Sequence, residues 1–277
     1  MYKRQKGCQK ADWENHKASC KVASVRRQVY QAGDLLQAVF YVFRETAFDM
    51  VYDKVVHESD GKLHVYDGWP LNDAVLARFP KDLNVSTPDK NALLCHNACG
   101  EAHVHLHELA RKAFKGTLIC GNESDGYLLT GHAGFDLNQL WEWRVRIYQD
   151  RKRIVQHKIT HFDFDGRNGS NLKHGMIDRT AYQHQIFRFQ APQGEVYVLD
   201  PAGAQYAQHQ AVVRAEEYHA KWIEESEDSC GSFPFGQYVK ERQEELRAIT
   251  ESSPEHDMRI PVLQSMLGTR LNAIIAG

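Results

Sequence analysis

The sequence predicts an α+β fold with N-terminal helices, a central antiparallel sheet and C-terminal helices. Apolar residues recur at intervals of three and four from about residue 22 to 56 and again from 89 to 114, as on the buried face of a helix. Apolar and polar residues then alternate from Trp141 to Tyr148, which is typical of a half-buried strand. Helical spacing returns after residue 208. Helices before and after a run of strands indicate an α+β arrangement.

The first long helix is expected to span residues 22–56 and to break at Gly33, with Asp34 as the N-cap of a second helix. Another long helix is expected from about 89 to 114, closed by Gly116. The sequence also predicts three shorter elements in this half of the chain: a strand at 62–66, a helix at 72–79 and a strand at 117–120.

The central strands are expected to pair as antiparallel neighbours, because turn residues separate them. Pro192, Gln193 and Gly194 form the clearest turn, between strands at 184–189 and 195–199. The other expected elements are a strand at 141–148, a turn at 149–152, a strand at 153–164, a loop at 165–171, and helices at 208–225, 237–250 and 261–277.

The composition is that of an ordinary globular protein. Charged residues make up 25% of the 277 residues and hydrophobic residues 42%, and the net charge of -2 gives no general attraction to nucleic acid. No apolar stretch approaches the roughly 20 residues needed to cross a bilayer, and the first residues lack a signal-peptide pattern. The six Cys residues do not form a disulfide framework, so we expect a reducing compartment, the nucleus or the cytoplasm.

The most specific motif is the N-terminal stretch from Cys8 to Cys20, which reads Cys-x7-His-x3-Cys with His16 between the two Cys residues. Residues four apart lie on one face of a helix, so His16 and Cys20 can bind the same metal ion. Thiolate and imidazole are ligands that zinc prefers in structural sites. Cys8, His16 and Cys20 are therefore candidate zinc ligands.

This stretch resembles the end of a MYND-type zinc finger in its Cys-Gln-Lys start, its Asp-Trp pair and its His-Lys-x-x-Cys end. The resemblance covers residues 1–21 and implies two zinc ions with eight ligands, Cys8 in one site and His16 and Cys20 in the other. With three ligands, the finger is expected to be incomplete in this chain and to hold less than one tightly bound zinc ion. The resemblance also implies protein partners, including proline-containing peptides. We therefore divide the chain into a truncated finger at 1–21 and one α+β domain at 22–277.

Other His and Cys residues are grouped by spacing alone. Four follow one another at intervals of four: Cys95, Cys99, His103 and His107. In a continuous helix they share one face, so that neighbouring members either chelate a metal ion or form a semi-polar face with hydrogen-bonded His. A second group alternates along an expected strand: His161, Asp163 and Asp165. These three either bind a cation or form an ordinary polar strand face.

A different constellation joins Cys99 to two distant residues. Cys99 precedes Gly100 where a helix could start, and a helix N-terminus favours a thiolate. His184 opens one strand of the expected hairpin and Asp200 closes the other, so the turn can bring their side chains together. This order resembles the transglutaminase-like and papain-like core over residues 95–205. The resemblance implies that His184 deprotonates Cys99 while Asp200 orients His184, and Cys95 is an equally available nucleophile.

Two functions of different classes follow. The N-terminal motif favours an intracellular zinc-finger protein that binds zinc and protein partners, with no catalytic activity assigned. The alternative is a thiol hydrolase or acyl transferase that uses Cys99, His184 and Asp200. Geometry separates them, because the enzyme requires the Cys99 thiol to lie within reach of an imidazole that Asp200 holds.

Overall fold

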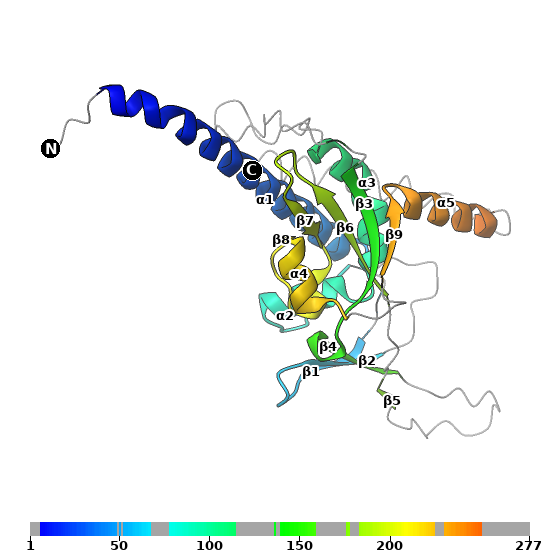
Figure 1. Ribbon diagram of the computed structural model, residues 1–277. Helices are drawn as coiled ribbons and strands as arrows, with labels where there is room; N and C mark the ends of the chain where they lie inside the picture. The colour runs from blue at the N-terminus through cyan, green and yellow to red at the C-terminus, as the bar shows by residue number, and fades with distance from the viewer. Residues whose placement is uncertain are drawn as a thin grey trace, which may run out of the picture.

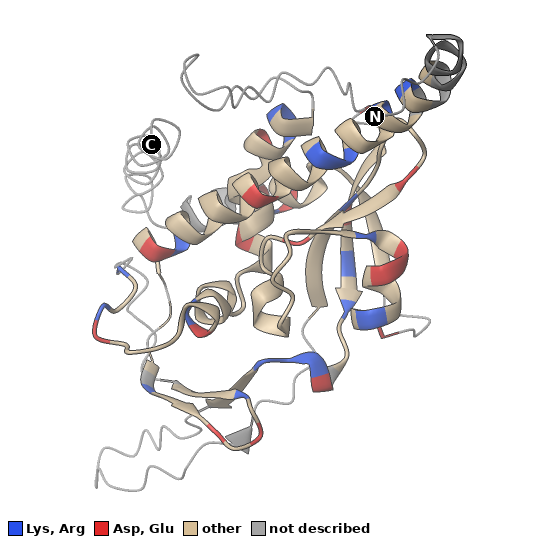
Figure 2. Cartoon of the chain, turned by 90° about the vertical axis from the view of Figure 1, so that its left-hand side faces the viewer, with Lys and Arg blue, Asp and Glu red and all other residues tan. Residues whose placement is uncertain are grey.

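The structure is a computed structural model that describes residues 6–48, 50, 52–67, 78–114, 136, 139–158, 176–177, 183–224 and 230–250. Its architecture is α+β, as the sequence predicts: a long helix comes first, a five-stranded antiparallel sheet forms the centre and a helix ends the described chain (Figure 1). No helix in these ranges is both long and apolar enough to cross a membrane. Residues of both charge signs are spread along the described helices and strands (Figure 2).

The first helix, α1 (Lys6–Thr46), is continuous. Its described side chains before Val25 are exposed or half-buried, and its buried face begins at Val25. The N-terminal half therefore projects from the body of the protein (Figure 1). The predicted break at Gly33 is wrong, because Gly33 serves close packing: a Cβ there would lie 2.2 Å from Val212 Cγ2.

The helix expected over residues 22–56 ends at Thr46, so the prediction is also wrong for residues 47–56. Tyr52–His57 forms β1, which pairs antiparallel with β2 (Leu63–Asp67), near the strand predicted at 62–66. Val55 and Val56 of β1 are β-branched and therefore favour a strand. Gly61, with φ of 76°, forms part of the connection from β1 to β2. Apolar spacing alone did not separate this strand from the preceding helix.

The central sheet has the strand order β8-β7-β6-β3-β9, and every neighbouring pair is antiparallel. Its strands are β3 (Leu140–Arg146), β6 (Gln183–Gln190), β7 (Val196–Leu199), β8 (Val212–Arg214) and β9 (Cys230–Pro234). The predicted strands at 141–148, 184–189 and 195–199 correspond to β3, β6 and β7. The sequence pattern did not predict β9, whose Gly231 and Ser232 interrupt the expected alternation.

Helices cover both faces of this sheet. Alternate β6 side chains, Phe187 and Phe189, pack into the core that α1 shares with α3 (Cys99–Phe114). Ile186 faces the other way, into a second core with Tyr218 and other side chains of α4 (Ala215–Trp222). The helix predicted at 208–225 starts later than expected. Residues 212–214 form strand β8, which pairs with β7, and α4 begins only after it.

A smaller sheet lies beside the first (Figure 1) and has the order β1-β2-β4-β5. Here β2 pairs parallel with β4 (Ile154–Lys158), and β4 pairs antiparallel with the two-residue β5 (Met176–Ile177). The turn expected at 149–152 is a short 3-10 helix, η2 (Gln149–Arg151). The chain after β3 thus leaves the central sheet instead of forming a hairpin within it.

The helix predicted from 89 to 114 is two helices. α2 (Thr87–Cys95) ends at Cys95, and α3 starts at Cys99. Between them, Asn97 has a φ of 55°, a left-handed conformation that Asn adopts more readily than most residues. The last described helix, α5 (Gln237–Thr250), lies where the sequence predicts it. The buried Glu142 carboxylate accepts hydrogen bonds from the backbone N–H groups of Gly236 and Tyr238 at its start.

Several predictions fall outside the described residues. These are most of the helix at 72–79, the strand at 117–120, the end of the strand at 153–164, the loop at 165–171, the helix at 261–277, and the group His161, Asp163 and Asp165.

Candidate functional site

Cys99 lies at the first residue of α3, because the chain turns at 96–98 before the helix begins. Its thiol is half-buried and donates a 3.9 Å hydrogen bond to the carbonyl oxygen of Gln183, the residue before His184. The first backbone N–H groups of a helix have no partner within it and carry the positive end of the helix dipole. The thiol therefore lies at the positive end of the α3 dipole.

His184 and Asp200 come from the β6–β7 hairpin, whose turn is closed by the Ala191 N–H donating to the Glu195 carbonyl at 2.7 Å. The strands pair Phe187 with Leu199. Asp200, one residue further along, is therefore a diagonal neighbour of His184 on the same side of the hairpin. The predicted hairpin thus brings these two side chains together.

The His184 imidazole is held by Asp200 through one of its two ring nitrogens. His184 Nε2 and Asp200 Oδ1 are 2.9 Å apart, and the two residues are 0% and 1% exposed. His184 Nδ1 is buried and has no hydrogen-bond partner among the described residues. Burial would lower the pKa of His184, but the charge and hydrogen bond of Asp200 and the neighbouring Cys99 thiol outweigh it and raise this pKa to about 10. The arrangement therefore favours the imidazolium form of His184.

The loop after Asp200 is tied to the turn before Cys99. The Asn97 N–H donates to Gln205 Oε1 at 3.2 Å, and Gln205 Nε2 donates to the Ala202 carbonyl at 3.2 Å. Gly203 leaves room for the carboxylate, since a Cβ there would lie 2.7 Å from Asp200 Oδ2. These contacts fix the turn at 96–98 and the loop after Asp200 relative to each other.

The other members of the four-residue stripe do not share this geometry. Cys95 belongs to α2, is fully buried and donates to the Pro201 carbonyl at 3.7 Å, and burial raises the pKa of its thiol. It is therefore not the equally available nucleophile that the sequence suggested. His103 Nδ1 bonds the Cys99 carbonyl at 3.1 Å, and burial lowers the pKa of His103 to about 4, so it remains neutral. The stripe is divided between two helices and does not form one metal-binding face.

The candidate zinc ligands lie at the far end of α1. His16 Nε2 and Cys20 Sγ are 3.3 Å apart on the exposed part of the helix. Cys8 is in the same helix, but its side chain is outside the described part. Across the described side chains, no group of three or more His, Cys, Asp or Glu residues is arranged to hold a metal ion. His16 and Cys20 are two residues, whereas a tetrahedral zinc site needs four ligands.

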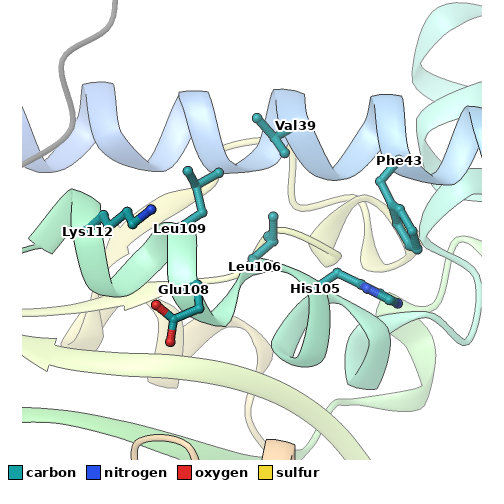
Figure 3. A pocket seen from close by; sticks show the side chains of 7 residues that line it. All are labelled: Val39, Phe43, His105, Leu106, Glu108, Leu109 and Lys112. Carbon is teal, nitrogen blue, oxygen red and sulfur yellow. The ribbon is translucent and has the colours of Figure 1, made fainter. Parts of the chain in front are cut away.

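A pocket of about 210 Å³ lies between α1 and α3, away from the start of α3 (Figure 3). Val39 and Phe43 of α1 face Leu106 and Leu109 of α3 across it. The His105 ring packs against Phe43, with ring centroids 4.1 Å apart and the ring planes tilted by 38°, and burial lowers the pKa of His105 to about 4. This pocket is a gap in helix packing and does not contain the Cys99 thiol.

Two aromatic residues near His184 were not singled out from the sequence. Tyr206 packs edge-on against the imidazole, with ring centroids 4.7 Å apart. The Tyr218 hydroxyl donates to Asp200 Oδ2 at 2.7 Å. No local pattern marks either residue, because both contacts depend on the tertiary placement of η3 (Gly203–Tyr206) and α4.

In comparisons with known proteins, no family model, no curated protein and no solved structure matches the chain.

Proposed function

We propose that this protein is a thiol-dependent hydrolase or acyl transferase, with Cys99 as nucleophile, His184 as general base and acid, and Asp200 as the residue that orients His184. The observation that supports it is the placement of the half-buried Cys99 thiol, which donates to the carbonyl of the residue before His184, near an imidazole that the buried Asp200 carboxylate holds. A nucleophile, a base within reach and a third group that holds the base form the arrangement of covalent acyl-transfer catalysis.

In the proposed reaction, His184 holds on Nδ1, as an imidazolium, the proton that Cys99 has given up, and the Cys99 thiolate attacks the carbonyl carbon of an acyl donor. A carbon–sulfur bond forms, and the carbonyl electron pair moves to oxygen, where the positive end of the α3 helix can stabilise the charge. The imidazolium then returns its proton to the leaving group as the bond to that group breaks, leaving a thioester. Water or another acceptor attacks the thioester, gives its proton to His184 and releases Cys99.

The test is acylation of the protein by p-nitrophenyl acetate. The reaction is monitored through the release of p-nitrophenol and through intact-protein mass spectrometry. We expect one acetyl group on Cys99, slow deacylation, and loss of both signals in Cys99→Ala. Cys20→Ser is the matched control, because Cys20 is an exposed cysteine in the projecting N-terminal half of α1. Equal acetylation of wild type and Cys99→Ala would contradict the proposal.

The N-terminal helix supports a second candidate function, zinc binding with recruitment of a protein partner. The supporting observation is the 3.3 Å separation of His16 Nε2 and Cys20 Sγ on an exposed helix face that the rest of the described protein does not cover. Two ligands supply half of a four-coordinate site, so we expect less than one tightly bound zinc ion per chain. Elemental analysis after gel filtration, on wild type and on His16→Ala/Cys20→Ser, checks this. One zinc per wild-type chain that resists chelator would contradict the incomplete site.

A further inference from the structure

Asp200 has two carboxylate oxygens, and the protein uses each for a different contact. Oδ1 lies 2.9 Å from His184 Nε2, and Oδ2 accepts the 2.7 Å hydrogen bond from the Tyr218 hydroxyl. His184, Asp200 and Tyr218 are each at most 1% exposed, so water does not readily take the place of either contact. The orientation of the carboxylate is therefore fixed at both of its ends.

We propose that Tyr218 is a positioning residue for the acyl-transfer site: its hydroxyl holds Asp200 so that the carboxylate keeps His184 aligned with the Cys99 thiol. This inference rests on the proposed thiol chemistry. Tyr218 does not touch the thiol, and it acts only through Asp200.

The surroundings of Tyr218 favour this role. α4 follows β8 directly, and Tyr218 packs beside Trp222, with ring centroids 5.2 Å apart, against the sheet face that carries His184. Burial raises the pKa of Tyr218 well above its ordinary value, so the phenol remains a protonated donor at neutral pH. A buried carboxylate that lost this donor would have an unsatisfied oxygen and would be free to rotate away from His184.

The experiment compares Tyr218→Phe with Tyr197→Phe. Tyr197 is a matched control, because its hydroxyl also donates to a carboxylate oxygen at 2.7 Å, that of Glu195, on the opposite side of the sheet. We expect Tyr218→Phe to lower the rate of Cys99 acetylation by roughly 10- to 100-fold, the range for losing a hydrogen bond to a charged group. Tyr197→Phe should remain within about twofold of wild type, since no hydrogen bond to the site is lost.

The imidazole of His184 supplies a readout that a merely structural role would not change. With ¹⁵N-labelled His, we expect the Nε2–H resonance and the titration of His184 to shift in Tyr218→Phe and to stay in place in Tyr197→Phe. An unchanged resonance with an unchanged acetylation rate would overturn the inference. If wild type is not acetylated, the proposed function fails, and the His184 resonance still decides whether Tyr218 positions Asp200.

A check on the wild-type protein covers the case in which Tyr218→Phe does not fold. The Tyr218 hydroxyl proton should give a slowly exchanging resonance, because the group is buried and hydrogen-bonded to Asp200. A hydroxyl proton that exchanges freely with bulk water would overturn the inference.

Discussion

Replacing His184 with Gln is expected to lower the rate of Cys99 acetylation by roughly 10²–10⁴-fold, the range for loss of a general acid–base group. Gln fills much of the same volume but neither accepts the thiol proton nor forms a cation beside the thiolate. The loss should be greatest near neutral pH, where a thiol without a base is mostly protonated. Stopped-flow p-nitrophenol release from pH 5 to 10, on wild type and His184→Gln, measures it. Rates within tenfold of each other at pH 7 would exclude His184 as the base.

The same variant should change how stability depends on pH. The pKa of His184 is raised in the folded protein to about 10, from an ordinary value of about 6.5. The folded state therefore binds the proton more tightly, and this stabilisation is fully present below about pH 6.5 and is lost as pH rises through about 10. Urea unfolding at pH 6 and pH 10 should show a larger fall in the free energy of unfolding for wild type than for His184→Gln. Equal falls would mean that the imidazolium–carboxylate pair does not form in the native protein.

Arg44→Ala is expected to give the largest loss of stability, about 3 kcal/mol or more, because it removes a large buried side chain and leaves the buried Leu94 carbonyl without its donor. The Arg44 guanidinium is 1% exposed, donates to the Leu94 carbonyl at 2.9 Å and forms an ion pair with Glu101. It thus links the last turn of α1 to the end of α2 and to the first turn of α3. Urea unfolding monitored by Trp fluorescence checks the loss.

Arg26→Ala is the control for Arg44→Ala. Arg26 also pairs with a distant carboxylate, that of Glu195, but its side chain is 48% exposed. Exposed ion pairs contribute little, so the loss should be much smaller than that of Arg44→Ala. Equal losses of unfolding free energy in the two variants would show that the contribution of Arg44 to stability does not depend on its burial.

The approach of His184 and Asp200 could be predicted from the sequence, because it depends on residues that lie close together along the chain. The turn around Gly194 separates two apolar strands, so pairing, and with it the approach of His184 and Asp200, follows from short-range pattern. The strands β3, β6 and β7 and the helix α5 were predictable for the same reason, because each has its own periodicity and its own end signals.

The start of α3 could not be predicted in the same way. Apolar spacing passes through residues 96–98 without interruption, and the break depends on the left-handed Asn97 and on its contact with Gln205, 108 residues along the chain. That break is what places Cys99 at a helix start. Tyr218 and β9 were missed on similar grounds, since Tyr218 is defined by its contact with Asp200 and β9 by its pairing with β3.

The uneven burial of α1 divides the protein into parts that open independently. Unwinding the turns before Val25 exposes no buried side chain among those described, whereas unwinding the turns around Leu36 and Phe40 exposes the main core. Amide hydrogens in the first part therefore exchange with solvent through local fraying, and those in the second only through opening of the whole domain. Motion at the projecting end, including any change when a partner binds there, can occur without disturbing the surroundings of Cys99.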